Sequence, residues 1–205
     1  RTLFLLAGHL TVLSVHGLAI AAGEVREFCR SGPPLYDVWH ALIARGTPWA
    51  VAFTRLEPNW VIAVGTLALI VTLLRLRDRE LLFRRFLVFH STMSIIRLSS
   101  IWVTTVPGTN PSCAGRVMSS DQLGERALTL TVDAIGIDHR WLGLGADGVT
   151  CCDTLVSGHT SMLMITAGLL LMSYRHRVIR GFVWGVTAVA LIATASPGRH
   201  YTVDV

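Results

Sequence analysis

Five long apolar runs, separated by polar links, constrain the fold of this 205-residue chain more than any other feature. Crossing the ~30 Å hydrocarbon core of a bilayer takes roughly 17–25 helical residues at about 1.5 Å each. A backbone inside lipid must pair its own polar groups, so each run predicts a helix. The runs are residues 2–22, 59–76, 86–106, 155–173 and 179–196.

Composition supports a membrane protein. Only 15% of the residues are charged and 52% are hydrophobic, whereas a soluble domain carries about a quarter charged residues. All 18 basic residues are arginines, and they cluster between the apolar runs rather than forming an aromatic-interleaved basic face, so nucleic-acid binding is set aside. The predicted fold class is therefore all-α: a polytopic transmembrane helical bundle, with residues 1–205 forming a single domain.

The arginine-rich links predict the orientation of the spans. Links 75–85 and 174–180 fall on the same side if the spans alternate, and positive links stay cytoplasmic. Loops 23–58 and 107–154 and the tail 198–205 then face the exoplasm or lumen. The two polar motifs of the chain, at the start of the fourth apolar run and at the C-terminus, therefore belong to the same surface.

Cysteine usage agrees with an oxidising exoplasmic side. All four cysteines fall on that side: Cys29, Cys113, Cys151 and Cys152. Four free thiols are one alternative. We favour at least one disulfide, between Cys113 and either Cys151 or Cys152, which connects the two ends of the long loop.

Two motifs carry candidate chemistry, "CCDTLVSGHT" at 151–160 and "GRHYTVDV" at 198–205. The fourth and fifth runs predict a helical hairpin, which returns His200 to the membrane depth of His159. His200 and Asp204 are spaced i, i+4, so on a helix they share one face. Asp204 can then orient one nitrogen of the imidazole and leave the other exposed.

Two histidines and a carboxylate suit phosphoryl transfer by a covalent route. His200 is the expected nucleophile at phosphorus, oriented by Asp204, and His159 is the expected general acid and then base. An unperturbed imidazole titrates near ~6.5, so both protonation states are accessible near neutral pH. No group of residues has zinc-ligand spacing, so neither a metal nor a cofactor is expected.

The same motifs resemble those of a known family. "CCDTLVSGHT" is similar to the C-G-D-x-x-x-S-G-H-T signature of the sphingomyelin synthase family, and "HYTVDV" to its H-Y-T-x-D-V signature. Both relate to motifs of the wider lipid phosphate phosphatase superfamily. Segments 84–107 and 33–37 resemble the family's paired-arginine span and its P-P-L-P-D loop, although Cys152, Tyr36 and Ser94 depart from the family pattern.

The resemblance implies a fold of six spans, so a fragment lacking the last transmembrane helix is expected. It also implies transfer of phosphocholine from phosphatidylcholine to ceramide, which releases diacylglycerol, in the Golgi or plasma membrane with the active site on the lumenal or exoplasmic face. Ethanolamine or inositol phosphate as the transferred group, and hydrolysis instead of transfer, are alternatives. The partners expected are these membrane lipids, and a homo-oligomer is left open.

Four further residues are candidate substrate ligands, each with a structural alternative. Ser157 either donates to the phosphate or caps the following helix. Arg199 either clamps phosphate oxygens or is solvated. Arg97, which is costly within a span, binds phosphate or pairs with a loop carboxylate. Asp153 either contacts a cationic head group or helps to form the start of the following helix.

Overall fold

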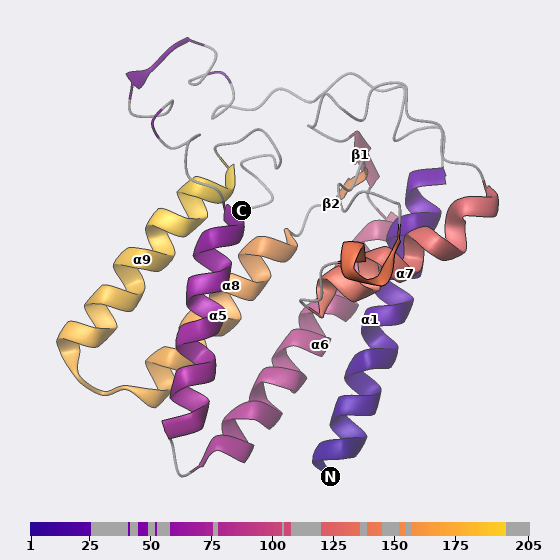
Figure 1. Cartoon of the computed structure of the whole chain (residues 1–205). Coiled ribbons are helices and arrows are strands. Elements are labelled where there is room, and N and C mark those ends of the chain that lie inside the picture. Colours follow the sequence, from indigo (N-terminus) through magenta and orange to yellow (C-terminus); the bar gives the residue numbers. More distant parts are fainter. Residues whose placement is uncertain are drawn as a thin grey trace. The chain divides into compact units, whose positions relative to one another are not determined.

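The computed structural model describes most of the chain (Figure 1). The described residues are 1–25, 41, 45–48, 52, 58–75, 78–103, 105–107, 120–135, 139–144, 152–154 and 157–195. Their α-helices are α1 (Thr2–Val25), α5 (Pro58–Arg75), α6 (Arg79–Val103), α7 (Leu123–Ala134), α8 (Gly158–Ser173) and α9 (Arg177–Ala195). The predicted all-α class is thus confirmed in its coarse form.

The short elements are two strands and two 3-10 turns. Strand β1 (Thr105–Pro107) pairs antiparallel with β2 (Cys152–Thr154). The turns are η2 (Ser120–Gln122) and η3 (His139–Leu142), which both pack on α7. The expected loop 107–154 therefore contains a helix of its own, which a search for long apolar runs does not find.

By its contacts the chain divides into two compact units. The first comprises Arg1–Leu5, Tyr36–His90 and Val156–Val205, and the second comprises Leu6–Leu35 and Ser91–Leu155. Helices α1 and α6 continue from one unit into the other.

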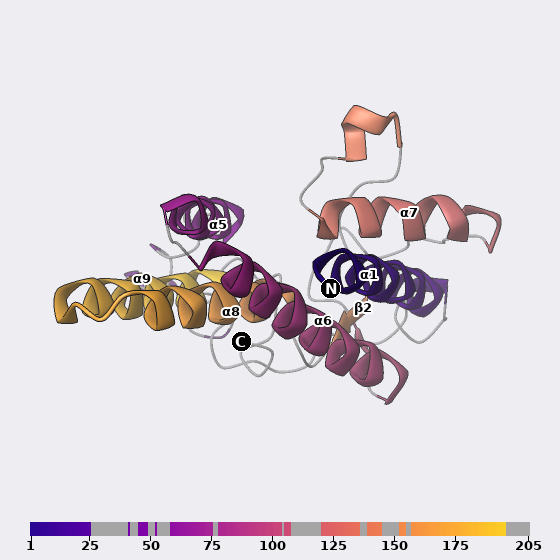
Figure 2. The ribbon, with the colours of Figure 1, turned by 90° about the horizontal axis from the view of Figure 1, so that it is seen from below.

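In the first unit, α5 and α8 run side by side in the same direction. A Cβ atom at Gly65 of α5 would lie 3.6 Å from Thr166 of α8, and further along the hydroxyls of Thr72 and Tyr174 lie 3.0 Å apart. The two residues of each pair are nearly equally far apart in the sequence. A separation that stays constant along two helices means that the helices run parallel. Helix α9 turns back after residues 174–176 and packs against both, as Figures 1 and 2 show.

Arginines gather at the end of this unit where α5 and α8 finish. Arg75 lies in the last turn of α5, and Arg180 Nη1 donates to the carbonyl of Leu171 in the last turns of α8 at 3.3 Å. Cations are favourable at helix C-termini because the backbone carbonyls there carry partial negative charge. These residues belong to the two links that the sequence predicts to be cytoplasmic.

The first turns of α6 bind the start of α1 at the edge of this unit. Glu80 accepts from the Thr2 hydroxyl at 2.7 Å and pairs with Arg84, which also donates to Thr2 at 2.8 Å. The hydrogen bonds from Thr2 and Arg84, with the charge of Arg84, lower the pKa of the Glu80 carboxyl. Helix α6 starts at Arg79, before the apolar run predicted at 86–106, and these polar contacts lie in its additional first turns.

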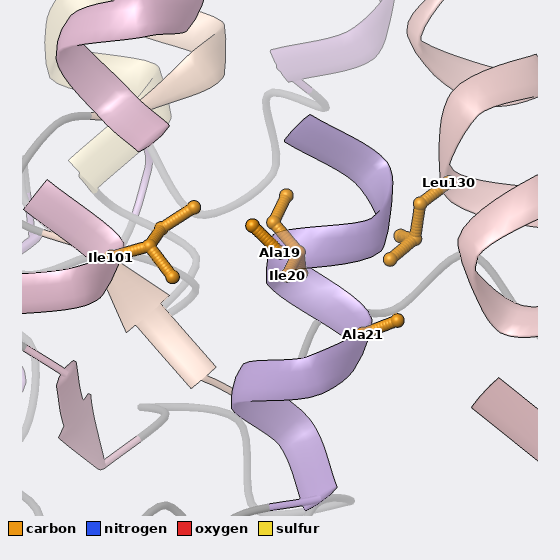
Figure 3. Close-up of a cluster of buried hydrophobic side chains, with 5 residues drawn as sticks. All are labelled: Ala19, Ile20, Ala21, Ile101 and Leu130. Atoms are coloured by element: carbon orange, nitrogen blue, oxygen red, sulfur yellow. The ribbon is translucent and has the colours of Figure 1, made fainter. Parts of the chain in front are cut away.

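In the second unit, α1 and α6 also run in the same direction. His9 Nδ1 and Ser91 Oγ lie 2.9 Å apart, and a Cβ at Gly23 would lie 3.8 Å from Ile101. A small apolar core lies near the C-terminal end of α1. It is formed by Ala19, Ile20, Ala21, Ile101 and Leu130. Figure 3 shows Ile101 of α6 and Leu130 of α7 pointing toward α1 from opposite sides.

Helix α7 is held against α1 by close contact and by charge. A Cβ at Gly17 would collide with Thr131 Oγ1 and would lie 2.8 Å from the carbonyl of Ala127, so only glycine admits α7 at this distance. Glu24 accepts two hydrogen bonds from Arg126, at 2.8 and 3.0 Å, and both side chains are buried. Removing one partner of such a pair leaves an uncompensated buried charge.

Two of the described helices are long and apolar enough to cross a membrane, Thr2–Glu24 and Arg177–Thr194. Shorter apolar helices cover Ile62–Arg75 and Gly158–Ser173. Each of the five apolar runs that the sequence predicts to be a span thus contains a described helix. The predicted disulfide lies outside the described residues, as do Cys29, Cys113, Cys151 and the side chain of Cys152.

Candidate active site

Ser157 begins the described part of the candidate site. It is the N-cap of α8, with an extended backbone at φ −65° and ψ 131°, and it is 1% exposed. Its Oγ accepts a hydrogen bond from the Thr160 amide at 3.3 Å, and its carbonyl accepts from the Ser161 hydroxyl at 2.8 Å. The capping role is thus observed, and the hydroxyl keeps its own hydrogen for donation to another acceptor.

His159 lies in the first turn of α8 and is half-buried. The first turn of an α-helix directs backbone N–H groups outward along the axis, and its partial positive charge favours an anion such as a phosphate. The sequence S-G-H therefore places an imidazole beside a position where phosphate oxygens would be stabilised.

Thr160 has a feature that the sequence did not single out. Among the residues that the structure describes, its Oγ1 is buried without a hydrogen-bond partner. A buried unpaired hydroxyl costs about 1–3 kcal/mol, so it calls for an explanation. The signal was its place directly after His159 in the S-G-H-T motif.

The predicted histidine pair is only half described. His200, Asp204 and Arg199 lie outside the described residues. The hairpin on which the pairing depends is present, because α9 packs against α8 and ends at Ala195, on the side where α8 begins (Figure 1). With 16 and 19 residues, the two helices span about 24 and 28 Å. The contact of the two imidazoles stays a prediction.

Asp153 and Arg97 belong to the second unit, whereas Ser157 and His159 belong to the first. Asp153 pairs with Val106 across the β1–β2 ribbon, so the start of the 151–160 motif is joined to the residues that follow α6. Arg97 is half-buried on α6, and its carbonyl accepts from the Ser100 hydroxyl at 2.8 Å. The grouping of these two residues around a substrate stays a prediction.

The C-terminal part of the chain is similar to a known protein family. Residues 150–205 match the family model described as PAP2 superfamily C-terminal. The match runs from the start of the 151–160 motif through the α8–α9 hairpin to the last residue. It therefore contains every predicted catalytic residue, namely His159, His200 and Asp204.

Similarity to individual proteins is more informative about function than the match to the family model. It is 31% identical over 178 residues to phosphatidylcholine:ceramide cholinephosphotransferase 2 of Macaca fascicularis, covering 84% of this chain and 46% of that protein. The identity to the Homo sapiens protein of the same name is 30% over the same shares. Phosphatidylcholine:ceramide cholinephosphotransferase 1 of Caenorhabditis elegans is 29% identical over 212 aligned residues, 98% of this chain and 42% of that protein.

The similarity to sphingomyelin synthase-type proteins that the motifs indicated is thereby confirmed. Those relatives are transferases by name. The chain spans less than half of their length.

Proposed function

We propose that this chain carries the catalytic centre of a sphingomyelin synthase-like enzyme, which moves phosphocholine from phosphatidylcholine to ceramide. The observation that carries the proposal is the S-G-H turn at the capped start of α8, inside the segment that matches the PAP2 superfamily. The similarity to cholinephosphotransferases supports the choice of lipids. The activity is proposed for the complete protein.

The reaction proceeds as two displacements at one phosphorus atom. His200 attacks the phosphorus of phosphatidylcholine, a nitrogen–phosphorus bond forms, and the bond to the diacylglycerol oxygen breaks while His159 gives that oxygen a proton. The ceramide hydroxyl then loses its proton to His159 and attacks the same phosphorus, which frees His200. Asp204 orients the imidazole of His200.

The start of α8 stabilises the charge that develops on the phosphate oxygens. Its backbone N–H groups and the hydroxyls of Ser157 and Thr160 are donors that need no rearrangement, because the helix cap already holds them. Thr160 supplies a buried hydroxyl that has no partner among the described residues, and a phosphate oxygen would be its acceptor. Arg199, Arg97 and Asp153 are the further proposed contacts to the lipid head group.

The enzyme is proposed to cross the membrane with each of its apolar helices, with the start of α8 on the lumenal or exoplasmic side. The parallel packing of α5 with α8 and of α1 with α6 supports this, since alternating spans predict the same directions. The arginines at the ends of α5 and α8 support a cytoplasmic placement of that side. The Golgi or plasma membrane is the proposed location.

The test is an assay of the complete protein with labelled phosphatidylcholine and ceramide, read by mass spectrometry of the lipids. Sphingomyelin and diacylglycerol should appear in equal amounts. His159→Asn and His200→Asn should each abolish turnover, whereas the matched control His176→Asn, in an exposed link, should not. Free phosphocholine without sphingomyelin would assign hydrolysis, and a product with another head group would overturn the choline assignment.

The covalent step has its own test. With ceramide withheld, phosphocholine should accumulate on His200 and be found on its peptide under alkaline conditions. The rate should also depend on pH between about 5 and 8, because one imidazole must be neutral while the other is protonated. A flat profile there would contradict the two-histidine mechanism.

A further inference from the structure

The end of the first unit where α5 and α8 finish carries a dense group of exposed arginines. Figure 1 shows the last turns of α5 and α8 and the first turns of α6 and α9 at this end. The hydroxyls of Thr72 and Tyr174 lie 3.0 Å apart there, so the arginines that follow them, Arg75 and Arg175, belong to the same end. The exposed arginines, here termed the arginine surface, are Arg75, Arg79, Arg85, Arg175, Arg177 and Arg180.

Few acidic side chains balance the arginine surface. In the described parts of links 75–85 and 174–180, the acidic residues are Asp78 and Glu80. Glu80 already pairs with Arg84, which is not part of the surface, and accepts a hydrogen bond from Thr2. Asp78 is the acidic residue of these described stretches that remains, so the surface is strongly cationic.

Helix stability accounts for only some of these arginines. Arg75 ends α5, and Arg180 Nη1 donates to the Leu171 carbonyl near the end of α8, where positive charge is favourable. Arg177 and Arg180 also stand in the first turn of α9, where positive charge is unfavourable, and this turn has no acidic residue. Arg175, in the link just before α9, adds to the same excess. A bound anion would offset this repulsion.

Exposed apolar side chains adjoin the arginines. Leu74 is 71% exposed, Val178 is 73% exposed and Phe182 is 71% exposed. Val178 and Phe182 are spaced i, i+4, so they share one face of α9. At the end of an apolar membrane helix, arginine side chains extend toward the head groups while their neighbours stay in the apolar layer. In the proposed membrane arrangement, the arginine surface therefore lies at the level of the lipid head groups.

We propose that the arginine surface binds the head groups of anionic phospholipids in the cytoplasmic leaflet. A guanidinium stays charged and can donate two parallel hydrogen bonds to phosphate oxygens. The occupant is a lipid rather than a soluble phosphate, because these arginines stand at the ends of apolar helices beside exposed apolar residues. The bound lipid carries a net negative charge, as phosphatidylserine does, and lies on the side opposite the proposed chemistry. The inference rests on the proposed membrane arrangement and not on the proposed reaction.

The experiment compares spin-labelled phosphatidylserine with spin-labelled phosphatidylcholine around the complete protein in phosphatidylcholine proteoliposomes. Electron paramagnetic resonance separates the lipid that is immobilised at the protein from the free lipid. The protein should prefer phosphatidylserine roughly twofold or more, averaged over all lipids that surround it. The preference should shrink in 1 M NaCl, where the screening length falls to about 3 Å. Equal association of the two lipids at low salt would overturn the proposal.

Variants locate the preference. The double variant Arg175→Gln/Arg177→Gln removes charge from the start of α9, and Arg45→Gln is the matched control, because Arg45 is also exposed but lies in a loop predicted on the opposite side. The double variant should lose most of the preference, and the control should keep it. A preference that survives in the double variant, or that is lost in Arg45→Gln instead, would contradict the assigned surface.

Two further measurements on the same proteoliposomes separate the alternatives. Inorganic phosphate should not release the spin-labelled lipid more than NaCl of equal ionic strength does, and a greater release would assign the surface to soluble phosphate and overturn the lipid proposal. Turnover of phosphatidylcholine and ceramide is measured in parallel. Normal turnover without a lipid preference overturns this inference alone, whereas a preference without turnover supports it and overturns the proposed reaction alone.

Discussion

At the scale of single residues, two hydroxyl groups at the start of α8 differ in their hydrogen bonding among the described residues. Ser157 is buried and caps the helix, and three residues later the Thr160 hydroxyl is buried without a partner among the described residues. Removing one hydroxyl or the other should therefore change stability and turnover differently, and substitutions at the two positions can show this.

Thr160→Val should reduce turnover without reducing stability. The substitution removes a buried hydroxyl that has no partner in the described part of the chain, so the melting temperature should stay the same or rise. A lost hydrogen bond to a charged phosphate is worth about 1.5–3 kcal/mol, which corresponds to a fall of roughly 10- to 150-fold in kcat/KM. Thr160→Ser, which keeps the hydroxyl, is the control. Unchanged kcat/KM in Thr160→Val would remove Thr160 from the site.

Ser157→Gly should separate the two roles of the serine. Glycine at an N-cap costs only a few tenths of a kcal/mol, whereas alanine costs about 0.5–2 kcal/mol. If the hydroxyl also donates to phosphate, both variants should lose at least tenfold in turnover, although only Ser157→Ala is clearly less stable. Thermal unfolding and lipid turnover, measured on the same preparations, decide this. Full activity in Ser157→Gly would leave capping as its role.

At the scale of the elements, helix packing depends on a few close contacts that hydropathy does not reveal. The close packing of α7 on α1 requires a glycine at position 17. The parallel pairs α1–α6 and α5–α8 are each joined by a polar contact, His9–Ser91 in the first and Thr72–Tyr174 in the second. The apolar runs predicted α1, α5, α6 and α8, but neither α7 nor the helix faces that meet.

Gly17→Ala should destabilise the second unit, and Gly8→Ala should not. A methyl group at Gly17 meets the backbone carbonyl of Ala127, which cannot rotate away, so a loss of about 1–3 kcal/mol is expected. A methyl group at Gly8, on the same helix, meets nothing within 4 Å. Limited proteolysis between α7 and β2, together with thermal unfolding, should report the difference. Equal stability of the two variants would contradict this packing.

Acid should weaken the attachment of α1 to the start of α6. The pKa of Glu80 is lowered from its usual value of 4.5, so the folded state favours the carboxylate. This contribution is therefore complete above about 4.5 and is lost as the pH falls through the lowered pKa. Fluorescence of a probe at Arg1 should show the loosening, and Glu80→Gln should abolish its pH dependence. The same acid transition in Glu80→Gln would assign it to another group.

At the scale of the whole molecule, the proposed alternation of spans makes a prediction about sidedness. Links 75–85 and 174–180 should be accessible from the cytoplasm, and loop 107–154 from the opposite side. Protease sites inserted into each segment, cleaved in sealed vesicles before and after permeabilisation, provide the measurement. Cleavage of links 75–85 and 174–180 on opposite sides would contradict the alternation.

The sequence by itself predicted where the five apolar helices form, and it named the candidate residues for the chemistry. The length of the apolar runs and the arginine clusters are local properties, because each segment must satisfy its backbone in lipid whatever its neighbours are. The motif at 151–160 and the motif at 198–205 are likewise visible without a fold, and their likeness to sphingomyelin synthase-type proteins agrees with the comparisons. His200 and Asp204, outside the described residues, are still known from sequence only.

Only the tertiary structure decided how these helices meet and what lies between them. The Glu24–Arg126 pair, the β1–β2 ribbon and the contact of α7 with Gly17 all join residues that are far apart in the sequence. The burial of the Thr160 hydroxyl, which has no partner within the described ranges, likewise depends on packing in three dimensions. The physical reason is that hydropathy is a property of one segment, whereas a close contact depends on which faces of two segments fit together. Burial, register and partner therefore become visible only when both segments are in place.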